Sequence, residues 1–329
     1  ALASYFEAID SESDDQVPNP YDKFRREPTT SPHTRIGFLN ILGKSFGPTN
    51  AFPDYLWEHR VRIIAEAVRA QALDVLGVVE IHFPGTSADQ SMELLAELRE
   101  IEPGSDWRHT NEGCAGGVFY KGSRFLLLNS GRGPAAPSPW PWLLLEDKAT
   151  GAKFIAATGH WAAAANAGQS RLDSARITAN QLDSLSAVYG VPVFSGIDTN
   201  DYAQFEGEPV QYMADRGYRP IQGAYPETKG FGLFPTWHDF NASADDTANG
   251  YTGWPQAGQE NAQWIDQIFS THAKVLGGGI AFYQEETNSL PVEFAYMSDH
   301  AMMYLDVEID PFYPQIQRAP RDGWFEVGP

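Results

Sequence analysis

Apolar residues gather along the chain in two kinds of pattern. Short continuous runs of branched and aromatic residues are typical of strands that are buried on both faces. Apolar positions repeated at intervals of three and four residues predict helices with one buried face. The runs cover residues 34–42, 75–81, 117–120, 125–128, 142–145, 154–158, 191–197 and 264–270, with a last run that follows Ser298-Asp299-His300 and reaches Ile309; helices are predicted at 55–73, 87–99 and 171–189.

The stretches between these patterns predict loops and termini. Residues 1–33 are acidic and then rich in Pro, which indicates an extended arm, and residues 310–329, with four Pro, predict a tail along the surface. Residues 222–262 are rich in Gly, Trp and Asn and predict a long functional surface loop. The glycine run at 277–279 predicts a turn. No repeat is visible, and 329 residues suit one domain or one domain with decorations, which we place at residues 34–309, between the arm and the tail.

Composition indicates a globular protein with a sizeable core. The 329 residues are 42% hydrophobic and 13% aromatic, which excludes a disordered or low-complexity chain. No apolar run approaches the eighteen or so residues that a membrane span requires, so we expect a soluble protein without a transmembrane segment. The chain begins with Ala rather than Met, which fits a processed, secreted protein, although a trimmed chain would look the same.

Charge and cysteine usage narrow the possible partners. A formal net charge of -20 argues against a broad polyanion-binding surface, although a bound divalent cation and a few arginines can reverse the field locally. The single cysteine, Cys114, cannot form an internal disulfide, and no Cys/His spacing fits zinc. Any metal is therefore expected to be one that prefers oxygen ligands. No protein partner is evident.

Polar residues recur where the apolar runs end. Strand ends that converge at one edge of packed sheets commonly assemble a site from distant parts of a sequence. An acid and an imidazole, Asp299 and His300, stand together at the start of the last run. The other residues in such positions are Asn40, Glu80, His160, Asp198 and Asn200.

Six segments in this order resemble the endonuclease/exonuclease/phosphatase superfamily, which has the deoxyribonuclease I-like fold. Each is weak alone, but together they span most of the chain. The segments are Phe38-Leu39-Asn40-Ile41, Gly77-Val78-Val79-Glu80, Thr158-Gly159-His160, Gly196-Ile197-Asp198-Thr199-Asn200, Trp264-Ile265-Asp266-Gln267-Ile268 and Ser298-Asp299-His300. The resemblance implies an α+β fold, an α/β sandwich in which two packed, mostly antiparallel β-sheets are flanked by helices. Val79 and Ile197 depart from the superfamily, which usually has Gln and Gly there.

The resemblance also implies a divalent metal site. Glu80 would be the principal ligand, with Asn40 and Asp299 nearby. Oxygen ligands of this kind suit Mg²⁺ best, with Mn²⁺ or Ca²⁺ as alternatives. A cation is needed because an anionic phosphoester repels the hydroxide that attacks it.

By the same resemblance, five residues would handle the water and the phosphate. His300 would take a proton from the attacking water, and Asp266 would hold the imidazole ring. Asp198 would position the water. His160 and Asn200 would donate hydrogen bonds to the phosphate oxygens as charge builds during in-line attack.

Most of these residues also have an ordinary structural explanation. Asn40 and the segment 198–200 suit turns, His160 suits a rim position bonded to the backbone, and Asp266 suits a pair with an arginine. Glu80 is harder to explain in this way, because a carboxylate that closes an apolar strand needs a partner. The conjunction of all of them favours a site.

The function expected from the sequence is metal-dependent phosphodiester hydrolysis, by a secreted nuclease acting on DNA. The alternatives are a phosphomonoesterase, a lipid (sphingomyelinase-like) phosphodiesterase, or a non-catalytic binding module with the same fold. A phosphoester, with nucleic acid as the first choice, is the expected partner. Candidate contacts to such a substrate are Arg132, Arg171, Arg176, Trp161, Trp237 and Trp254, most of the Trp being expected to serve packing; Tyr120 is expected in the core.

Overall fold

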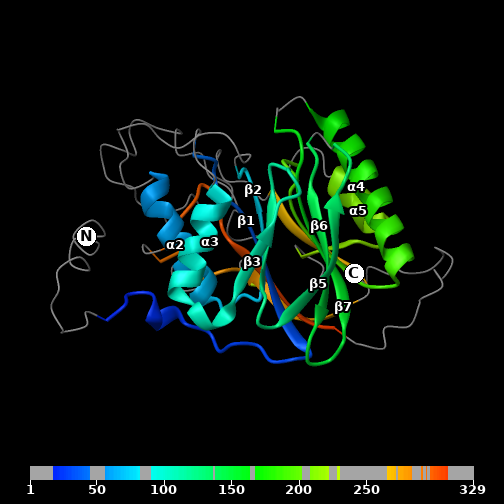
Figure 1. The fold of residues 1–329 in the computed structure, drawn as a ribbon. Helices are drawn as coiled ribbons and strands as arrows, with labels where there is room; N and C mark the ends of the chain where they lie inside the picture. Colours follow the sequence, from blue (N-terminus) through cyan, green and yellow to red (C-terminus); the bar gives the residue numbers. More distant parts are fainter. Residues whose placement is uncertain are drawn as a thin grey trace, which may run out of the picture.

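Two β-sheets pack face to face, and each is covered on its outer face by helices (Figure 1). The first sheet has seven strands in the order β10-β12-β13-β1-β2-β4-β3, and the second has six in the order β5-β6-β7-β8-β11-β9. Most neighbouring strands are antiparallel, while β1/β2, β7/β8 and β10/β12 are parallel. The α+β sandwich expected from the sequence is therefore confirmed.

The computed structural model describes most of the chain. The described residues are 18–44, 56–81, 90–135, 138–163, 167–201, 208–221, 228–229, 265–271, 273–283, 290–291, 294 and 297–309. The first half of the predicted arm, nearly all of the predicted 222–262 loop with Trp237 and Trp254, and the predicted tail lie outside these ranges.

The strands follow the apolar runs closely. Those of the first sheet are β1 (His33–Asn40), β2 (Val75–Val79), β3 (Trp107–Thr110), β4 (Gly117–Lys121), β10 (Thr228–Lys229), β12 (Lys274–Ile280) and β13 (Met303–Glu308). Those of the second are β5 (Phe125–Arg132), β6 (Pro141–Asp147), β7 (Lys153–His160), β8 (Val193–Asp198), β9 (Arg219–Pro220) and β11 (Asp266–Ser270).

Four α-helices and two short 3-10 helices complete the described fold. Figure 1 shows α2 and α3 on the first sheet and α4 and α5 on the second. Within the described residues, no helix combines the length and apolarity that crossing a bilayer requires. The helices are η1 (Asp22–Phe24), α2 (Trp57–Ala70), α3 (Gln90–Ile101), η3 (Pro103–Ser105), α4 (Gly168–Tyr189) and α5 (Glu208–Asp215).

Alternation along the strands divides the core into three layers. In β2, Leu76 and Val78 face α2 and α3, whereas Val75 and Val79 face the second sheet. A third cluster lies between α4 and the outer face of the second sheet. The sheets meet closely where Gly196 of β8 faces Phe38, since a Cβ on Gly196 would lie 2.3 Å from the Phe38 ring.

Some sequence-based assignments need correction. The glycines at 277–279 do not form a turn but lie inside β12, paired with β13. The reason is close approach, because a Cβ on Gly278 would lie 2.8 Å from the Tyr304 carbonyl oxygen. The predicted 125–128 strand continues to Arg132. Within the predicted arm, Tyr21 is buried against the first sheet's helical layer and β1 begins at His33.

Strand directions give the sandwich two distinct edges. Strands β1, β2, β7 and β8 run toward one edge, which we call the site edge, and β4, β6, β11 and β13 begin there, as the pairings of Val78 with Gly117 and of Phe38 with Met303 require. The far edge lies at the other ends of these strands. The polar strand-end residues predicted from the sequence belong to the site edge.

Candidate active site

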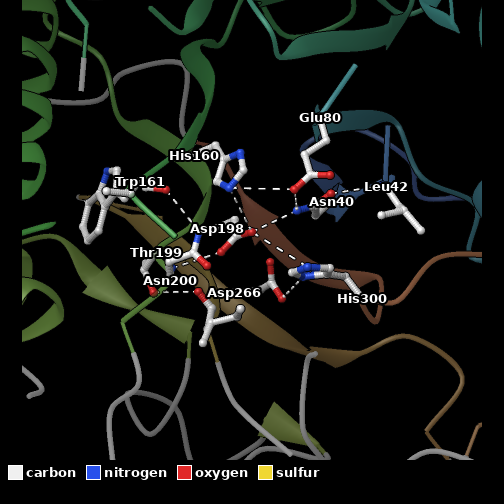
Figure 2. A network of polar contacts seen from close by, with 12 residues as sticks. Asn40, Leu42, Glu80, His160, Trp161, Asp198, Thr199, Asn200, Asp266 and His300 are labelled. Carbon is white, nitrogen blue, oxygen red and sulfur yellow. Dashed lines mark hydrogen bonds and ion pairs between the residues drawn. The ribbon is translucent and has the colours of Figure 1, made fainter. Parts of the chain in front are cut away.

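Four neighbouring strand ends bring the predicted residues together at the site edge. Asn40 ends β1, Glu80 follows β2, His160 ends β7 and Asp198 ends β8. Asp266 begins β11 and pairs with Asp198 across the sheet. Figure 2 shows these side chains pointing toward one another from the two sheets, with His300 reaching the group from the segment that precedes β13.

The backbone turns sharply at three positions around the group. Glu80 has a φ of 62°, Asn200 a φ of 46° and Leu42 a φ of 52°. Positive φ is uncommon for residues with a Cβ and costs on the order of 1–3 kcal/mol. Strain of this kind concentrates at functional sites, and here it turns the chain just after β1, β2 and β8.

Asn40 links two carboxylates. Its Nδ2 donates to Glu80 Oε1 and to Asp198 Oδ2, both at 2.9 Å, and its Oδ1 accepts from the Leu42 N–H at 3.0 Å. The amide oxygen that a cation would need is therefore turned toward the backbone. In this arrangement Asn40 positions Glu80 and Asp198, and its predicted role as a direct metal ligand would require the amide to rotate. That role stays a prediction.

Asp198 is buried at the centre of the group. Its Oδ1 accepts the Asn200 N–H at 3.0 Å, so the Asx-type turn weighed for this segment is present. Asp198 Oδ2 faces Asn40 and His160 instead. Asn200 donates from Nδ2 to the Trp161 carbonyl at 3.1 Å. The segment is thus both a turn and a part of the site.

His160 lies at the rim. Its Nε2 is 3.6 Å from Asp198 Oδ2 and 3.8 Å from Glu80 Oε1, and its side chain is about a third exposed. A rim position bonded only to the backbone, the ordinary explanation weighed for this residue, is not what the structure has. Glu80 is partly exposed beside it, and its Oε2 accepts the Gly43 N–H at 3.3 Å.

His300 and Asp266 form a buried dyad. His300 Nδ1 lies 2.7 Å from Asp266 Oδ2, which fixes the ring and directs Nε2 toward Asp198 Oδ2, 3.9 Å away. Ser298 holds the segment in place, donating from Oγ to the Asn40 carbonyl at 2.6 Å and accepting the His300 N–H at 3.2 Å. The pairing of Asp266 with an arginine, weighed from the sequence, is replaced by this pairing with His300.

Negative charge dominates the group and changes two pKa values. Burial raises the pKa of Asp299 to about 6, and the charge of Glu80 adds to this effect. Burial acts to lower the pKa of His300, but the negative charges of Asp266, Asp299 and Asp198 raise it to about 10. Carboxylates this close together hold negative charge that an external cation can neutralise.

The donor atoms fit a hard divalent cation. Glu80, His160 and Asp198 offer ligand atoms that all lie within 4.8 Å of one another, as do Asp198, Asp266 and His300. Oxygen predominates, which suits Mg²⁺, Mn²⁺ or Ca²⁺ better than a thiolate-preferring metal. Asp299 Oδ1 lies 4.0 Å from His300 Nε2, on the same side of the group.

A buried arginine, Arg60, lies directly behind the group. Arg60 of α2 donates to the Leu42 carbonyl at 2.8 Å and to the Met297 carbonyl at 3.3 Å, joining the segments that carry Asn40 and His300. Burial lowers the pKa of Arg60 to about 10, which the nearby Asp299 and Glu80 oppose. The apolar periodicity of the helix does not predict that Arg60 is buried, because the residues that Arg60 contacts lie in loops.

The other described candidates for substrate contact differ in how far their side chains are buried. Arg171 is buried and donates to the Ala162 carbonyl, so it is not available to a substrate, and this expectation was wrong. Arg176 pairs with Asp173 on the exposed face of α4. Trp161 and Tyr120 are buried packing residues, as expected. Arg132 is exposed at the end of β5, on the site edge.

The chain was compared with known protein families, curated sequences and solved structures, and only solved structures match it. No protein-family model and no curated protein sequence matches the chain. An endonuclease/exonuclease/phosphatase structure from Bacteroides vulgatus matches with a TM-score of 0.61 at 18% identity, covering 84% of this chain and 99% of that one. The fold of the endonuclease/exonuclease/phosphatase superfamily, expected from the six segments, is thereby confirmed.

Two further matches come from proteins with described ligands or activities. A mannosyl-6-phosphatase from Bacteroides thetaiotaomicron has a TM-score of 0.58 at 16% identity, covering 83% of this chain and 99% of that one. A TDP2 structure from D. rerio in complex with a single-strand DNA product has a TM-score of 0.55 at 14% identity, covering 84% and 98%. At these identities the likeness concerns the fold.

Proposed function

We propose that this chain is a metal-dependent phosphoester hydrolase in which His300 activates the attacking water. The observation that supports the proposal is the convergence of Glu80, Asp198 and Asp299 with the His300–Asp266 dyad at one edge of this fold. Bringing like charges together is costly unless something neutralises them. A divalent cation and a phosphoester supply opposite charge and substrate in one site.

Glu80 and Asp299, with Asp198 beside them, would hold the cation. A bound cation of this kind neutralises phosphate charge and lowers the pKa of a coordinated water. Asn40 keeps Glu80 and Asp198 aligned through its two hydrogen bonds. The strained turns at Glu80 and Asn200 fix the directions of their side chains in advance of binding.

His300 accepts the proton of the attacking water at Nε2 in this proposal. Asp266 holds Nδ1–H, which leaves Nε2 as the acceptor, and stabilises the imidazolium that results. Neutral Nε2 requires that the surrounding negative charge be reduced, and a cation near Asp299 does so. His160 and Asn200 are placed to donate to phosphate oxygens, Asn200 with the amide hydrogen that Trp161 leaves available.

The sequence favours DNA as the substrate and secretion as the location, and both stay predictions. Among proteins of this fold, the mannosyl-6-phosphatase acts on a monoester and TDP2 binds a single-strand DNA product. A site of this kind is compatible with a phosphomonoester substrate and with a DNA substrate. The alternative of a non-catalytic binding module is disfavoured, because a binding surface has no need of a buried His–Asp dyad directed at the acids.

A metal-dependent activity panel tests the proposal. The purified protein is assayed on bis-p-nitrophenyl phosphate, p-nitrophenyl phosphate, plasmid DNA, RNA and sphingomyelin with Mg²⁺, Mn²⁺ or Ca²⁺, and again with chelator. We expect hydrolysis that the chelator abolishes. His300→Ala should lower kcat roughly 10²–10⁴-fold, the usual contribution of a general base.

His33→Ala is the matched control. His33 lies at the far edge near Glu308, with half of its side chain exposed, so its removal should leave kcat unchanged. Absence of turnover of every ester with every metal would rule out the hydrolase. Full activity of His300→Ala would instead rule out the assignment of the base.

A further inference from the structure

The backbone just after β1 forms hydrogen bonds with two side chains of the candidate site. The Leu42 N–H donates to Asn40 Oδ1 at 3.0 Å, and the Gly43 N–H donates to Glu80 Oε2 at 3.3 Å. Leu42 has a φ of 52°, which a residue with a Cβ adopts only when its surroundings hold it there. The orientation of the Asn40 amide therefore depends on what holds residues 41–43, which we call the 41–43 turn.

Arg60 of α2 holds the 41–43 turn from the side of the helix. Its Nη1 donates to the Ile41 carbonyl at 2.5 Å, and its Nη2 donates to the Leu42 carbonyl at 2.8 Å. Both backbone polar groups of Leu42 are thus engaged, the N–H by Asn40 and the carbonyl by Arg60. Because the donors of a guanidinium are fixed in one plane, they constrain two successive carbonyls more closely than a flexible ammonium could.

The same guanidinium reaches the segment that carries His300. Arg60 Nη1 also donates to the Met297 carbonyl at 3.3 Å. The next residue, Ser298, donates from Oγ to the Asn40 carbonyl at 2.6 Å and accepts the His300 N–H at 3.2 Å. Arg60 and Ser298 therefore both join the chain around the end of β1 to the segment before β13.

The surroundings of Arg60 suit a fixed role. Its side chain is fully buried, which is uncommon for a guanidinium. Burial lowers its pKa to about 10, so the group still carries its charge at pH 7, and the negative charges of Asp299 and Glu80 favour the charged form. The indole ring of Trp57 has its centroid 5.4 Å from Arg60 Cζ. A guanidinium with these contacts can hold a backbone turn, but it is too deeply buried to bind a substrate.

We infer that Arg60 is a positioning residue of this site, which acts through the 41–43 turn to orient the Asn40 amide. Its effect passes from the Leu42 carbonyl to the Leu42 N–H and Asn40 Oδ1, and from Asn40 Nδ2 to Glu80 and Asp198. The inference rests on the proposed hydrolase function, in which these two carboxylates must be aligned. A misplacement of about 1 Å in such a supporting group can cost about 10²-fold in rate.

Kinetics of Arg60→Met and Arg60→Lys test this role. Hydrolysis of bis-p-nitrophenyl phosphate is measured with Mg²⁺ or Mn²⁺, and kcat is expressed per folded molecule, with the folded fraction taken from urea unfolding. We expect kcat to fall roughly 10–10²-fold in Arg60→Met and less in Arg60→Lys, with a smaller change in KM. Arg62→Met is the matched control on the same helix. Because Arg62 pairs with Glu97 and Glu100 at the surface, its loss should leave kcat unchanged.

Hydrogen exchange of the metal-free protein tests the contacts without any assay of activity. The amides of Leu42, Gly43 and His300 all donate to side chains of the site or its support. In Arg60→Lys and Arg60→Met these amides should exchange at least about threefold faster than in the unmodified protein, because their segments open locally more often. The amides of β6, which pair with β7, should exchange at unchanged rates.

A double-mutant cycle with Asn40→Ala tests the route of the effect. If Arg60 acts by orienting the Asn40 amide, its substitution should matter little once that amide is gone. Arg60→Lys should therefore lower kcat much less in the Asn40→Ala protein than in the unmodified protein. A residue that served folding alone would change the folded fraction in both backgrounds and kcat in neither.

The outcomes separate this inference from the proposed function. Unchanged kcat in folded Arg60→Met, unchanged exchange at Leu42, or equal losses of kcat with and without Asn40 would each overturn the inference. If Arg60→Met failed to fold, Arg60→Lys would supply the same comparisons. If the unmodified protein hydrolysed no ester with any metal, the proposed function would be wrong, while hydrogen exchange would still show whether Arg60 holds the 41–43 turn.

Discussion

The two edges of the sandwich both gather carboxylates but neutralise them differently. At the far edge three acids each pair with an arginine of the chain. At the site edge the acids meet an asparagine, two histidines and one another. The far-edge acids are Asp74, Asp147 and Asp306; those of the site edge are Glu80, Asp198, Asp266 and Asp299.

Arg124 is the centre of the far edge. It lies 3.0 Å from Asp147 and 2.8 Å from Asp74, and it donates to the His33 carbonyl and the Thr34 hydroxyl. These partners come from both sheets. The guanidinium, with its five donors in one plane, therefore joins the sheets at this edge.

Two further arginines form ion pairs with Asp306. Arg35 lies 2.6 Å from Asp306 Oδ1, and Arg26 lies 3.1 Å from Oδ2. All of these charges are satisfied within the chain, so the far edge contributes to stability and has no use for a ligand. Among the described residues, the site-edge acids contact Asn40, His160 and His300 instead, and we propose that a bound cation neutralises the rest of their charge. Variants at the two edges should therefore separate stability from activity.

The largest effect is expected from Glu80→Gln at the site edge. The amide keeps the shape of the side chain but weakens the proposed cation site. We therefore expect kcat/KM to fall at least about 10³-fold, which corresponds to about 4 kcal/mol of activation free energy. Stability without metal should stay equal or rise slightly, since one of several like charges is removed. Steady-state kinetics and urea unfolding of the same preparation measure both effects. If Glu80→Gln lowered the unfolding free energy as strongly as it lowered the activity, the site edge would not be separable from stability.

Arg124→Met should produce the opposite result at the far edge. Removing the guanidinium leaves Asp74 and Asp147 buried and unpaired, which costs about 3–5 kcal/mol of unfolding free energy. The fraction that remains folded should keep the kcat of the unmodified protein. Arg124→Lys, which restores charge but not the planar donor fork, should lie between the two. Loss of kcat in the folded fraction would show that the edges are coupled.

Metal binding should stabilise the protein only through the site edge. A ligand at 100 times its Kd raises the unfolding free energy by about 2.7 kcal/mol. We expect Mg²⁺ or Mn²⁺ to raise the Tm of the unmodified protein and of Arg124→Lys by a similar amount. Glu80→Gln should show little or no rise. A full rise in Glu80→Gln would place the metal elsewhere.

Much of the fold could be predicted from the sequence because burial and periodicity are local signals. The runs at 75–81 and 154–158 became β2 and β7; Glu80 directly follows β2, and β7 ends at His160. The glycines of β12 were misassigned because glycine also serves close backbone approach, which depends on Tyr304 in a neighbouring strand. The short strand β3 and the helix α5 carried too little periodicity to be found.

The residues of the candidate site and one of its pairings were predicted, whereas the rest of its internal arrangement was not. The resemblance implies that Asp266 holds the His300 ring, and the structure brings the two side chains to 2.7 Å. The direction of the Asn40 amide and the burial of Arg60 depend on backbone contacts made by Leu42 and Met297. Such contacts leave no periodic trace in a sequence.

The smallest effect is expected from the pH dependence of the far edge. Burial acts to raise the pKa of Asp147, but hydrogen bonds from Ser31, the Ala149 N–H and Arg124 lower it overall. Because the folded pKa lies below the ordinary value of 3.8, this stabilisation is present above about pH 4 and is lost as the pH falls through the folded pKa. Asp147→Asn should therefore cost about 2 kcal/mol at pH 7 and much less at a pH below the folded pKa, measured by urea unfolding. The partly exposed Glu308, whose pKa the Lys274 hydrogen bond also lowers, is the matched control, and Glu308→Gln should change stability little at either pH. An equal pH response of the two variants would mean that the buried pairing at Arg124 contributes no more than a surface ion pair, and the contrast between the edges would then rest on activity alone.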